Sequence, residues 1–312
     1  MRRSLPVIQD AQGQPLAEPA TKKPEWLKIR PPGGEHYTAM KHRARRLKLA
    51  TVCEEARCPN LSECWGGGTA TFMLMGEICT RGCRFCAVDT KKLPPPLDPD
   101  EPRAIAEAVE EMGLSYVVLT SVNRDELPDG GASHLADCLN AIHQRTPSVL
   151  MEMLSPDFEG NMRSVELVAS TPLAVFAHNV ETVERLTPSV RDPRASYAQS
   201  LEVLEHAKRF VPHVLTKSSL MVGLGESEAE IEACLRDLRD VDCDIVTFGQ
   251  YLQPTPKHLP VVEYAHPNTF ERYAELARGL GFGYVASGPL VRSSYRAGEL
   301  FVERHLRARA QV

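Results

Sequence analysis

The stretch ATFMLMGEICTRGCRFCAV, residues 70–88, runs from an apolar segment directly into three cysteines. Its first part, TFMLMGEI, is short and apolar, which predicts a buried strand. Cys79, Cys83 and Cys86 follow in the spacing Cys-x3-Cys-x2-Cys. In sheets of parallel strands, the loops at the carboxyl ends of the strands form the rim of the active site. We therefore expect the three thiols to lie at such a rim.

The remainder of the chain repeats this pattern. The runs SYVVLTSV, SVLMEML, LAVFAHNV, HVLTKSSLMVGL and DIVTFGQYL alternate with amphipathic segments such as AIAEAVEEMG. Strands that alternate with helices predict an α/β fold of βα units around a parallel sheet. The segment GFGYVASGPLVRSSYRAG trails after a final helix. Before the first strand, a Pro-rich arm covers the first 34 residues, and residues 35–58 predict a helix.

Composition describes an ordinary soluble globule. The 312 residues are 43% hydrophobic and 25% charged, with a formal net charge of −5, so nucleic acid is not expected as a partner. Between Lys22 and Lys48 the chain has nine Lys/Arg and only two Glu. This positively charged segment is suited to an acidic partner. The chain has neither a run of 18 apolar residues nor an apolar start suited to a signal peptide, so we expect no membrane partner and a cytoplasmic location.

Six of the nine cysteines fall between residues 53 and 86, and disulfides are rare in a reducing compartment. Three thiolates at Cys79, Cys83 and Cys86 can bind three irons of a 4Fe-4S cluster and leave the fourth iron open. An open iron can chelate the amine and carboxylate of S-adenosylmethionine, which reductive cleavage turns into a carbon radical. A zinc knuckle would want a fourth Cys or His nearby, and structural thiols fit the spacing poorly.

A second set, Cys53, Cys58 and Cys64, has the spacing Cys-x4-Cys-x5-Cys. It again offers three thiolates without a close fourth, so a second 4Fe-4S cluster is the leading hypothesis. The alternative is a set of reduced thiols that supports the loop.

Several motifs together carry a resemblance to a family. VCEEARCPNLSECW, the cysteine stretch quoted first, TSVNRDELPDGGA, FAHNVETVERL, TKSSLMVGLGE and GPLVRSSYRAG occur in that order over residues 24–300. They resemble the lipoyl synthase family of the radical S-adenosylmethionine (SAM) superfamily. The resemblance implies a partial (β/α)6 TIM-like barrel over residues 66–285, an N-terminal arm and helix over 1–65, and a C-terminal extension over 286–312.

The resemblance also implies roles for the cysteines. Cys79, Cys83 and Cys86 would bind the cluster that cleaves SAM, and Cys53, Cys58 and Cys64 an auxiliary cluster that supplies sulfur. The family completes the auxiliary cluster with a serine of an Arg-Ser-Ser-Tyr motif, here residues 292–295. We assign Ser294, with Ser293 as the alternative; an ordinary polar loop is the competing interpretation of this segment.

The reaction implied is the insertion of two sulfur atoms at C6 and C8 of an octanoyl chain that is amide-linked to a lysine of a carrier domain. Such positions have no acidic proton, so a radical is the sensible route. The implied partners are octanoylated lipoyl-carrier domains of 2-oxo acid dehydrogenase complexes and the glycine cleavage carrier protein. An electron donor (ferredoxin or flavodoxin) and an iron-sulfur carrier that rebuilds the auxiliary cluster complete the set.

Other polar residues give weaker signals. Asn179 and Glu181 resemble the residues that radical SAM enzymes turn toward the ribose hydroxyls of the cofactor. Lys217 and Ser218 are assigned to the methionine carboxylate, although both could simply fill the polar rim of a barrel. The loop at Asn123–Asp125 has an equally good explanation as a capped turn.

Two other functions stay open. A methylthiolating enzyme that acts on transfer RNA would share the radical chemistry, but it would need a basic face, which the net charge opposes. A non-enzymatic iron-sulfur carrier would bind clusters without cleaving SAM. Formation of 5′-deoxyadenosine separates the carrier from either enzyme.

Overall fold

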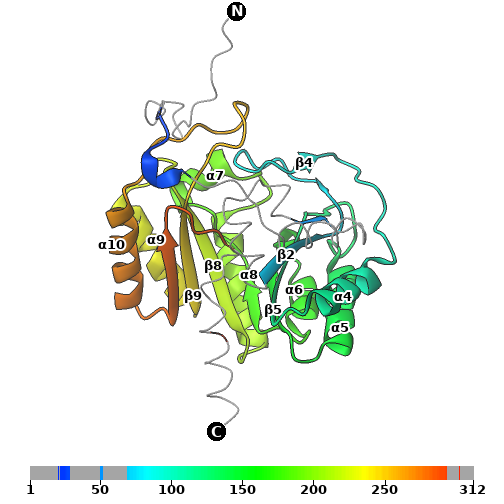
Figure 1. The fold of residues 1–312 in the computed structure, drawn as a ribbon. Helices are drawn as coiled ribbons and strands as arrows, with labels where there is room; N and C mark the ends of the chain where they lie inside the picture. The colour runs from blue at the N-terminus through cyan, green and yellow to red at the C-terminus, as the bar shows by residue number, and fades with distance from the viewer. Residues whose placement is uncertain (1–19, 21, 29–49, 52–68, 294–301, 303–312) are drawn as a thin grey trace, which may run out of the picture.

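The computed structural model describes residue 20, residues 22–28, 50–51 and 69–293, and residue 302. Its main sheet has eight strands in the order β1-β2-β5-β6-β7-β8-β9-β10 (Figure 1). The seven strands after β1 are parallel to one another and follow the order of the chain. They are β2 (Thr69–Leu74), β5 (Tyr116–Ser121), β6 (Leu150–Leu154), β7 (Val175–Ala177), β8 (Leu215–Val222), β9 (Ile245–Gln250) and β10 (Tyr284–Gly288).

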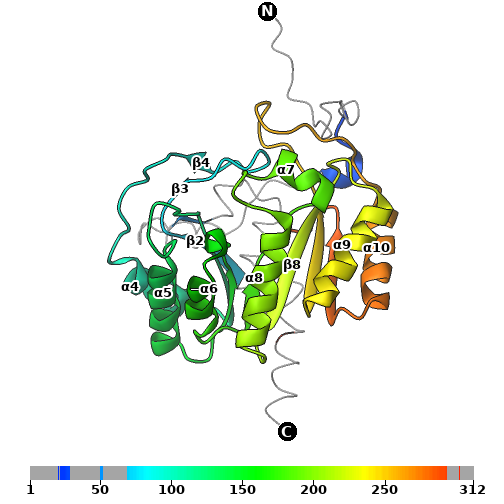
Figure 2. The ribbon, with the colours of Figure 1, turned by 180° about the vertical axis from the view of Figure 1, so that it is seen from behind.

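A helix lies between each of the seven parallel strands of the main sheet and the next, and these helices cover the outer face of the sheet, as Figure 2 shows. These six are α4 (Glu101–Met112), α5 (Ala132–Arg145), α6 (Met162–Ala169), α8 (Tyr197–Phe210), α9 (Glu228–Asp240) and α10 (Pro267–Gly279). The chain determines their ends locally. Ser227 and Glu230 form a capping box at the start of α9, and Gly113 ends α4 with a left-handed φ of 60°.

The two faces of the sheet bury different side chains. Val117 and Leu119 of β5 belong to the large core under the helices, whereas Tyr116 and Val118 pack with Val175 in a separate, smaller core. Because successive side chains of a strand point to opposite faces, this second core lies on the concave, inner face. The sheet therefore separates a large core under the helices from a smaller core on its inner face.

The predicted fold class is confirmed. Six βα units run from β2 to α10, and β10 adds a seventh parallel strand from the segment expected to trail after the last helix. In the described part of the chain the sheet ends at β1 on one side and at β10 on the other, so the barrel is partial. The division into residues 1–65, 66–285 and 286–312 stays a prediction.

The prediction of a helix over residues 35–58 is wrong for residues 50–51, the part of that range that the structure describes. Ala50 and Thr51 form strand β1 (Ala50–Thr51), which pairs antiparallel with Met73 and Phe72 of β2. Pairing with an open sheet edge outweighs a modest helix propensity. The rest of that segment lies outside the described residues. In the expected N-terminal arm, η1 (Glu25–Leu27) forms one short turn and Leu27 is fully buried.

Short elements lie at the carboxyl edge of the sheet. They are β3 (Ile78–Cys79), β4 (Asp89–Thr90), η2 (Phe158–Gly160), η3 (Glu184–Leu186) and α7 (Thr187–Val190). All of them belong to loops that follow β2, β6 or β7, so this edge has the most elaborate connections. Among the helices that the structure describes, none combines the length and the apolar character needed to cross a membrane.

Candidate active site

The segment between Cys79 and Cys86, here called the cysteine loop, leaves the carboxyl edge at β3. The thiols of Cys79, Cys83 and Cys86 are free and half-buried. Cys79 Sγ accepts the backbone N–H groups of Arg81 at 3.4 Å and Asn123 at 3.3 Å. Cys83 Sγ accepts the backbone N–H of Asp192 at 3.3 Å. Two loops of the edge thus direct N–H donors at the sulfurs, as in sites where sulfur carries negative charge.

Burial alone would keep two of these thiols protonated. It raises the pKa of Cys83, and it raises the pKa of Cys86 to about 12. A bound cation reverses this preference, because metal ligands must be deprotonated. A metal centre would therefore favour the thiolate forms of Cys83 and Cys86.

The predicted ribose-binding pair lies beside the cysteine loop. Asn179 is buried at the end of β7 and donates from Nδ2 to Glu181 Oε1 at 3.1 Å. Burial raises the pKa of Glu181, while Arg191 and Asn179 oppose the shift. The charge of Glu181 also raises the pKa of Cys83 and of Cys86, so the carboxylate faces both thiols. The backbone of Glu181 has a φ of 67°, a strained value for a non-glycine residue and one that is common at functional sites.

Unpartnered polar atoms gather at the same edge. Among the described residues, five buried side-chain atoms have no hydrogen-bond partner, and all five belong to the last residue of β5 or to the loops after β5 and β7. They are Ser121 Oγ, Glu126 Oε2, Asn179 Oδ1, Thr182 Oγ1 and Arg191 Nε. Buried polar atoms are rarely left unpaired in a folded protein, so this edge is suited to receive a polar ligand.

Lys217 and Ser218 have other partners. Lys217 lies in the lower half of β8 and donates to Glu152 Oε1 at 2.6 Å, and Tyr116 donates to the other oxygen of Glu152 at 2.7 Å. Ser218 Oγ accepts the backbone N–H of Val180 at 3.1 Å. The structure brings neither side chain to the cysteine loop, and their assignment to the methionine carboxylate stays a prediction without support from these contacts.

Several charged residues of the edge escaped the sequence analysis. Arg81 is buried inside the cysteine loop and forms ion pairs with Asp125 at 2.8 Å and Asp157 at 2.7 Å. Burial opposes its charge, but the hydrogen bonds that Arg81 donates to both carboxylates outweigh that effect and hold the pKa of Arg81 above its usual range. Arg191, Asp192 and Arg194 lie in the loop between α7 and α8. Asp125 alone was noticed in the sequence, where a capped turn explained it equally well.

Hydrogen bonds within the loop after β8 fix its conformation. Glu226 accepts the backbone N–H groups of Gly223 and Leu224 at 2.5 and 2.9 Å. Gly223 has a φ of 101°, and a Cβ there would lie 2.3 Å from Glu263 O. Only glycine tolerates both this positive φ and this close approach of the backbone. A local turn therefore explains the glycine at position 223.

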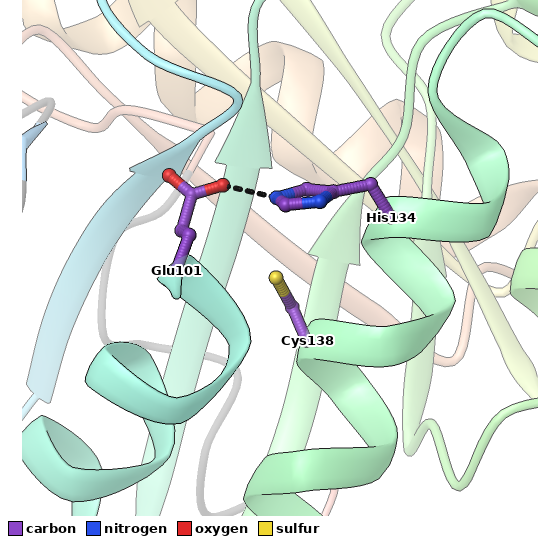
Figure 3. A group of neighbouring side chains, drawn as sticks. All are labelled: Glu101, His134 and Cys138. Atoms are coloured by element: carbon purple, nitrogen blue, oxygen red, sulfur yellow. Dashed lines mark hydrogen bonds and ion pairs between the residues drawn. The ribbon is translucent and has the colours of Figure 1, made fainter. Parts of the chain in front are cut away.

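A further cluster braces the strand that precedes the cysteine loop. Glu101 of α4 and His134 of α5 approach to 2.6 Å above the thiol of Cys138 (Figure 3). In the described part of the chain, these three alone form a His/Cys/Asp/Glu group with all ligand atoms within 4.8 Å. Glu101 also accepts the backbone N–H of Met75, just after β2, at 3.0 Å. Because burial raises the pKa of Cys138, its thiol stays protonated, and the cluster acts as a brace between β2 and two helices.

The second set of predicted ligands cannot be compared. Cys53, Cys58, Cys64 and Ser294 lie outside the described residues, while Ser293 is half-buried at the end of the described chain. The backbone before it packs on β9, because a Cβ at Gly249 would lie 2.1 Å from Val291 O. The Arg-Ser-Ser-Tyr motif thus begins next to the carboxyl end of β9.

Family comparisons agree with this geometry. The model of the radical SAM superfamily matches residues 73–238, and that of the N-terminal domain of lipoyl synthase matches residues 11–58. Lipoyl synthase 1 of Phaeodactylum tricornutum is 53% identical over 324 residues, which cover 98% of this chain and 80% of the relative. Lipoyl synthase of Schizosaccharomyces pombe is 56% identical over 92% of this chain and 79% of its own length.

Solved structures show the same fold at low sequence identity. Methylornithine synthase (PylB) aligns with a TM-score of 0.53 at 12% identity over 80% of this chain and 81% of its own. The [FeFe]-hydrogenase maturase HydG aligns with a TM-score of 0.53 at 13% identity, over 83% of this chain and 69% of its own.

The predicted cytoplasmic location is wrong by the same comparison. Both relatives are named mitochondrial, which points to the mitochondrion. The prediction rested on the lack of an apolar run, but mitochondrial leaders are amphipathic and rich in Arg, so that criterion does not detect them.

The radical SAM family implies a 4Fe-4S cluster and SAM, and the residues present fit both. Two of the three free thiols accept backbone N–H groups, and a carboxylate and an unpaired amide oxygen lie beside them. With relatives above 50% identity over most of its length, the chain belongs to the lipoyl synthase family of the radical SAM superfamily.

Proposed function

We propose that this chain inserts two sulfur atoms, at C6 and C8, into an octanoyl chain carried on a lysine of a lipoyl-carrier domain. Cys79, Cys83 and Cys86 would hold the cluster that cleaves SAM. The observation that carries the proposal is the convergence of these three thiols with Asn179 and Glu181 at one edge of the barrel. When bound, a 4Fe-4S cluster with one open iron supplies the electron that cleaves SAM.

The polar residues at the edge would bind and orient the nucleoside. Glu181 and Asn179 offer a carboxylate and an unpaired amide oxygen to the two ribose hydroxyls. Arg191 is a better candidate than Lys217 for the methionine carboxylate, because its charge acts on both Cys83 and Glu181. Lys217 is already paired with Glu152.

The auxiliary cluster is the second part of the proposal. Cys53, Cys58, Cys64 and Ser294 would hold it, and it would supply the sulfur. The N-terminal lipoyl synthase model, which covers residues 11–58 and so includes two of the three cysteines, supports this assignment. The carrier domains named above, a ferredoxin or flavodoxin, and an iron-sulfur carrier are the partners that the reaction needs.

A single-turnover assay without oxygen tests the whole proposal. Reconstituted protein receives SAM, a reductant and an octanoyl-lysine peptide, and mass spectrometry follows the peptide. We expect a gain of two sulfurs, with a monothiolated species appearing first. Formation of 5′-deoxyadenosine with an unchanged peptide would redirect the substrate assignment to the methylthiolation alternative.

Two sets of variants separate the clusters. Replacing Cys79, Cys83 and Cys86 by Ala removes both 5′-deoxyadenosine and sulfur insertion. Replacing Cys53, Cys58 and Cys64 by Ala leaves 5′-deoxyadenosine formation but removes sulfur insertion. If the second set still thiolated the peptide, the auxiliary cluster would not be the sulfur source.

The serine ligand has a matched control next to it. An alkoxide is a harder and poorer partner for iron than a thiolate, so the corner held by Ser294 should open most easily. Ser294→Cys is expected to keep its iron and slow sulfur insertion, whereas Ser293→Cys should behave as wild type. The opposite ranking would move the ligand to Ser293, and normal turnover in both variants would discard the lability argument.

A further inference from the structure

Five charged side chains of alternating sign connect three loops of the carboxyl edge with the cysteine loop. We call them the ion chain: Asp157, Arg81, Asp125, Arg194 and Asp192. The distances between successive members are 2.7 Å (Asp157–Arg81), 2.8 Å (Arg81–Asp125), 3.0 Å (Asp125–Arg194) and 2.9 Å (Arg194–Asp192). The Asp125–Arg194 contact joins the loops after β5 and β7, which are 69 positions apart in sequence.

The last two members hold the backbone of the cysteine loop. Asp192 Oδ2 accepts the backbone N–H of Gly82 at 2.9 Å, and Arg194 Nη2 donates to Thr80 O at 2.8 Å. These two contacts bind one backbone N–H donor and one backbone C=O acceptor of the segment between Cys79 and Cys83. A loop whose polar backbone is bound in this way has fewer conformations to lose when it receives a ligand.

Asp192 also acts on a sulfur atom through its own backbone. Its N–H donates to Cys83 Sγ at 3.3 Å while its side chain accepts from Gly82, the neighbour of Cys83. Asp192 Oδ1 further accepts the backbone N–H of Arg194 at 3.1 Å, which shapes the turn that aims this N–H. One carboxylate thus determines the position of Gly82 and the direction of the donor to Cys83.

We propose that Asp192, held by Arg194, is a positioning residue for the SAM-cleaving cluster: it aligns Cys83 before the cluster binds, and its negative charge lowers the cluster's reduction potential. The inference rests on the proposed function in one respect, that Cys79, Cys83 and Cys86 are the ligands. Hydrogen bonds to sulfur and nearby charge are the means by which a protein adjusts such a potential.

Two substitutions separate the two effects. Asp192→Asn keeps an oxygen that can accept from Gly82 N–H but removes the charge. Asp192→Ala removes both. Glu110→Gln, at an exposed ion pair between α4 and α5, is the matched control for loss of a carboxylate elsewhere.

The first measurement uses cluster-free, full-length protein and needs no SAM chemistry. Cysteines are alkylated with iodoacetamide, and mass spectrometry follows the rate at Cys83. We expect Asp192→Ala to react about tenfold faster than wild type, because the loop loses a charge-assisted hydrogen bond. Asp192→Asn should fall between the two, and Glu110→Gln should match wild type.

The second measurement follows the reduction potential of reconstituted protein by a redox titration monitored by electron paramagnetic resonance. The Cys53, Cys58 and Cys64 to Ala background keeps the spectrum to one cluster. Asp192→Asn should retain its iron and shift the midpoint potential upward, because a negative charge near the cluster is gone. A purely structural role would leave that potential unchanged.

The outcomes are distinguishable from those of the proposed function. If wild type in this background binds no iron at all, the assignment of the ligands is wrong, and the alkylation rates still decide whether Asp192 aligns Cys83. An unchanged alkylation rate in Asp192→Ala, or an unchanged potential in Asp192→Asn, overturns the corresponding half of the inference. Should Asp192→Ala fail to fold by circular dichroism, Asp192→Asn carries both measurements.

Discussion

The ion chain at the carboxyl edge and the ion pair inside the barrel use the same chemistry for different purposes. Arg81 joins Asp125 and Asp157, with only 2% of its side chain exposed. Lys217 joins Glu152, each with 4% of its side chain exposed. The first links loops and contacts the cysteine loop, whereas the second connects strands β6 and β8 within the sheet. The two sets of ion pairs therefore differ in what they hold: the ion chain contacts the backbone of the cysteine loop, and the interior pair contacts only strands of the sheet.

Removal of Arg81 should have the largest effect. Arg81→Met leaves the buried Asp157 without its ion-pair partner and removes one of the two arginines paired with Asp125, and breaking a buried pair in this way costs about 3–5 kcal/mol. Because Arg81 lies between Cys79 and Cys83, iron uptake on reconstitution should fall together with the free energy of unfolding. Denaturant unfolding and iron analysis check the two effects; full iron uptake in a destabilised protein would mean that the ion chain does not shape the loop.

Lys217→Met sharpens the comparison, since it should destabilise without that second effect. It leaves Glu152 buried and unpaired, and we expect a loss of about 3 kcal/mol in the free energy of unfolding. Iron uptake at low temperature should equal that of wild type. The double variant Lys217→Met with Glu152→Gln keeps an acceptor for the Tyr116 hydroxyl and should recover most of the stability. Iron loss in Lys217→Met would show that the interior pair also serves the site.

His178 extends the comparison to a buried group without a counter-ion strong enough to charge it. It is buried between Ser155 O and Ser200 Oγ, and burial, then Arg191, lowers its pKa to about 4, against 6.5 in the unfolded chain. Above pH 6.5 both states are neutral. As the pH falls from 6.5 to 4, only the unfolded state takes up the proton, so stability should fall by about 2–3 kcal/mol.

The matched variant for this pH effect is His178→Gln. The quantity to measure is the difference in free energy of unfolding between wild type and variant at several pH values between 7 and 4. The difference should shrink as the pH falls, because only wild type loses the contribution of a neutral imidazole. A difference independent of pH would show that the pKa of His178 is the same in the folded and the unfolded protein.

The sequence predicted the sheet well because the required information is local. Each buried strand is an apolar run bounded by breakers, and the cysteine loop, Asn179 and Glu181 follow such runs directly. Lys217 and Ser218 show the limit of this reasoning. Adjacent residues of a strand point to opposite faces, and Lys217 is the third residue of an eight-residue strand, well below its carboxyl end.

The ion chain was beyond sequence reasoning for a different reason. Its contacts join residues separated by 44 positions (Arg81 and Asp125) and 76 positions (Arg81 and Asp157). A charged residue in a loop is usually solvated, and nothing local distinguishes the buried Asp192 from Arg194, which is exposed. One signal was available: VRDPRA supplies three charges within four positions in the loop that also contains Asn179 and Glu181.

An exposed ion pair provides the smallest effect and completes the comparison. Arg145 and Glu110 connect α5 with α4, and their side chains are 44% and 48% exposed. Glu110→Gln should change the free energy of unfolding by about 0.5 kcal/mol or less, because water and salt screen the pair. Thermal unfolding at low and at high salt measures this, and the small difference should vanish at high salt. If Glu110→Gln instead cost as much as Lys217→Met, burial would not be what gives the interior pair its strength, and the distinction between the two buried sets would have to rest on geometry alone.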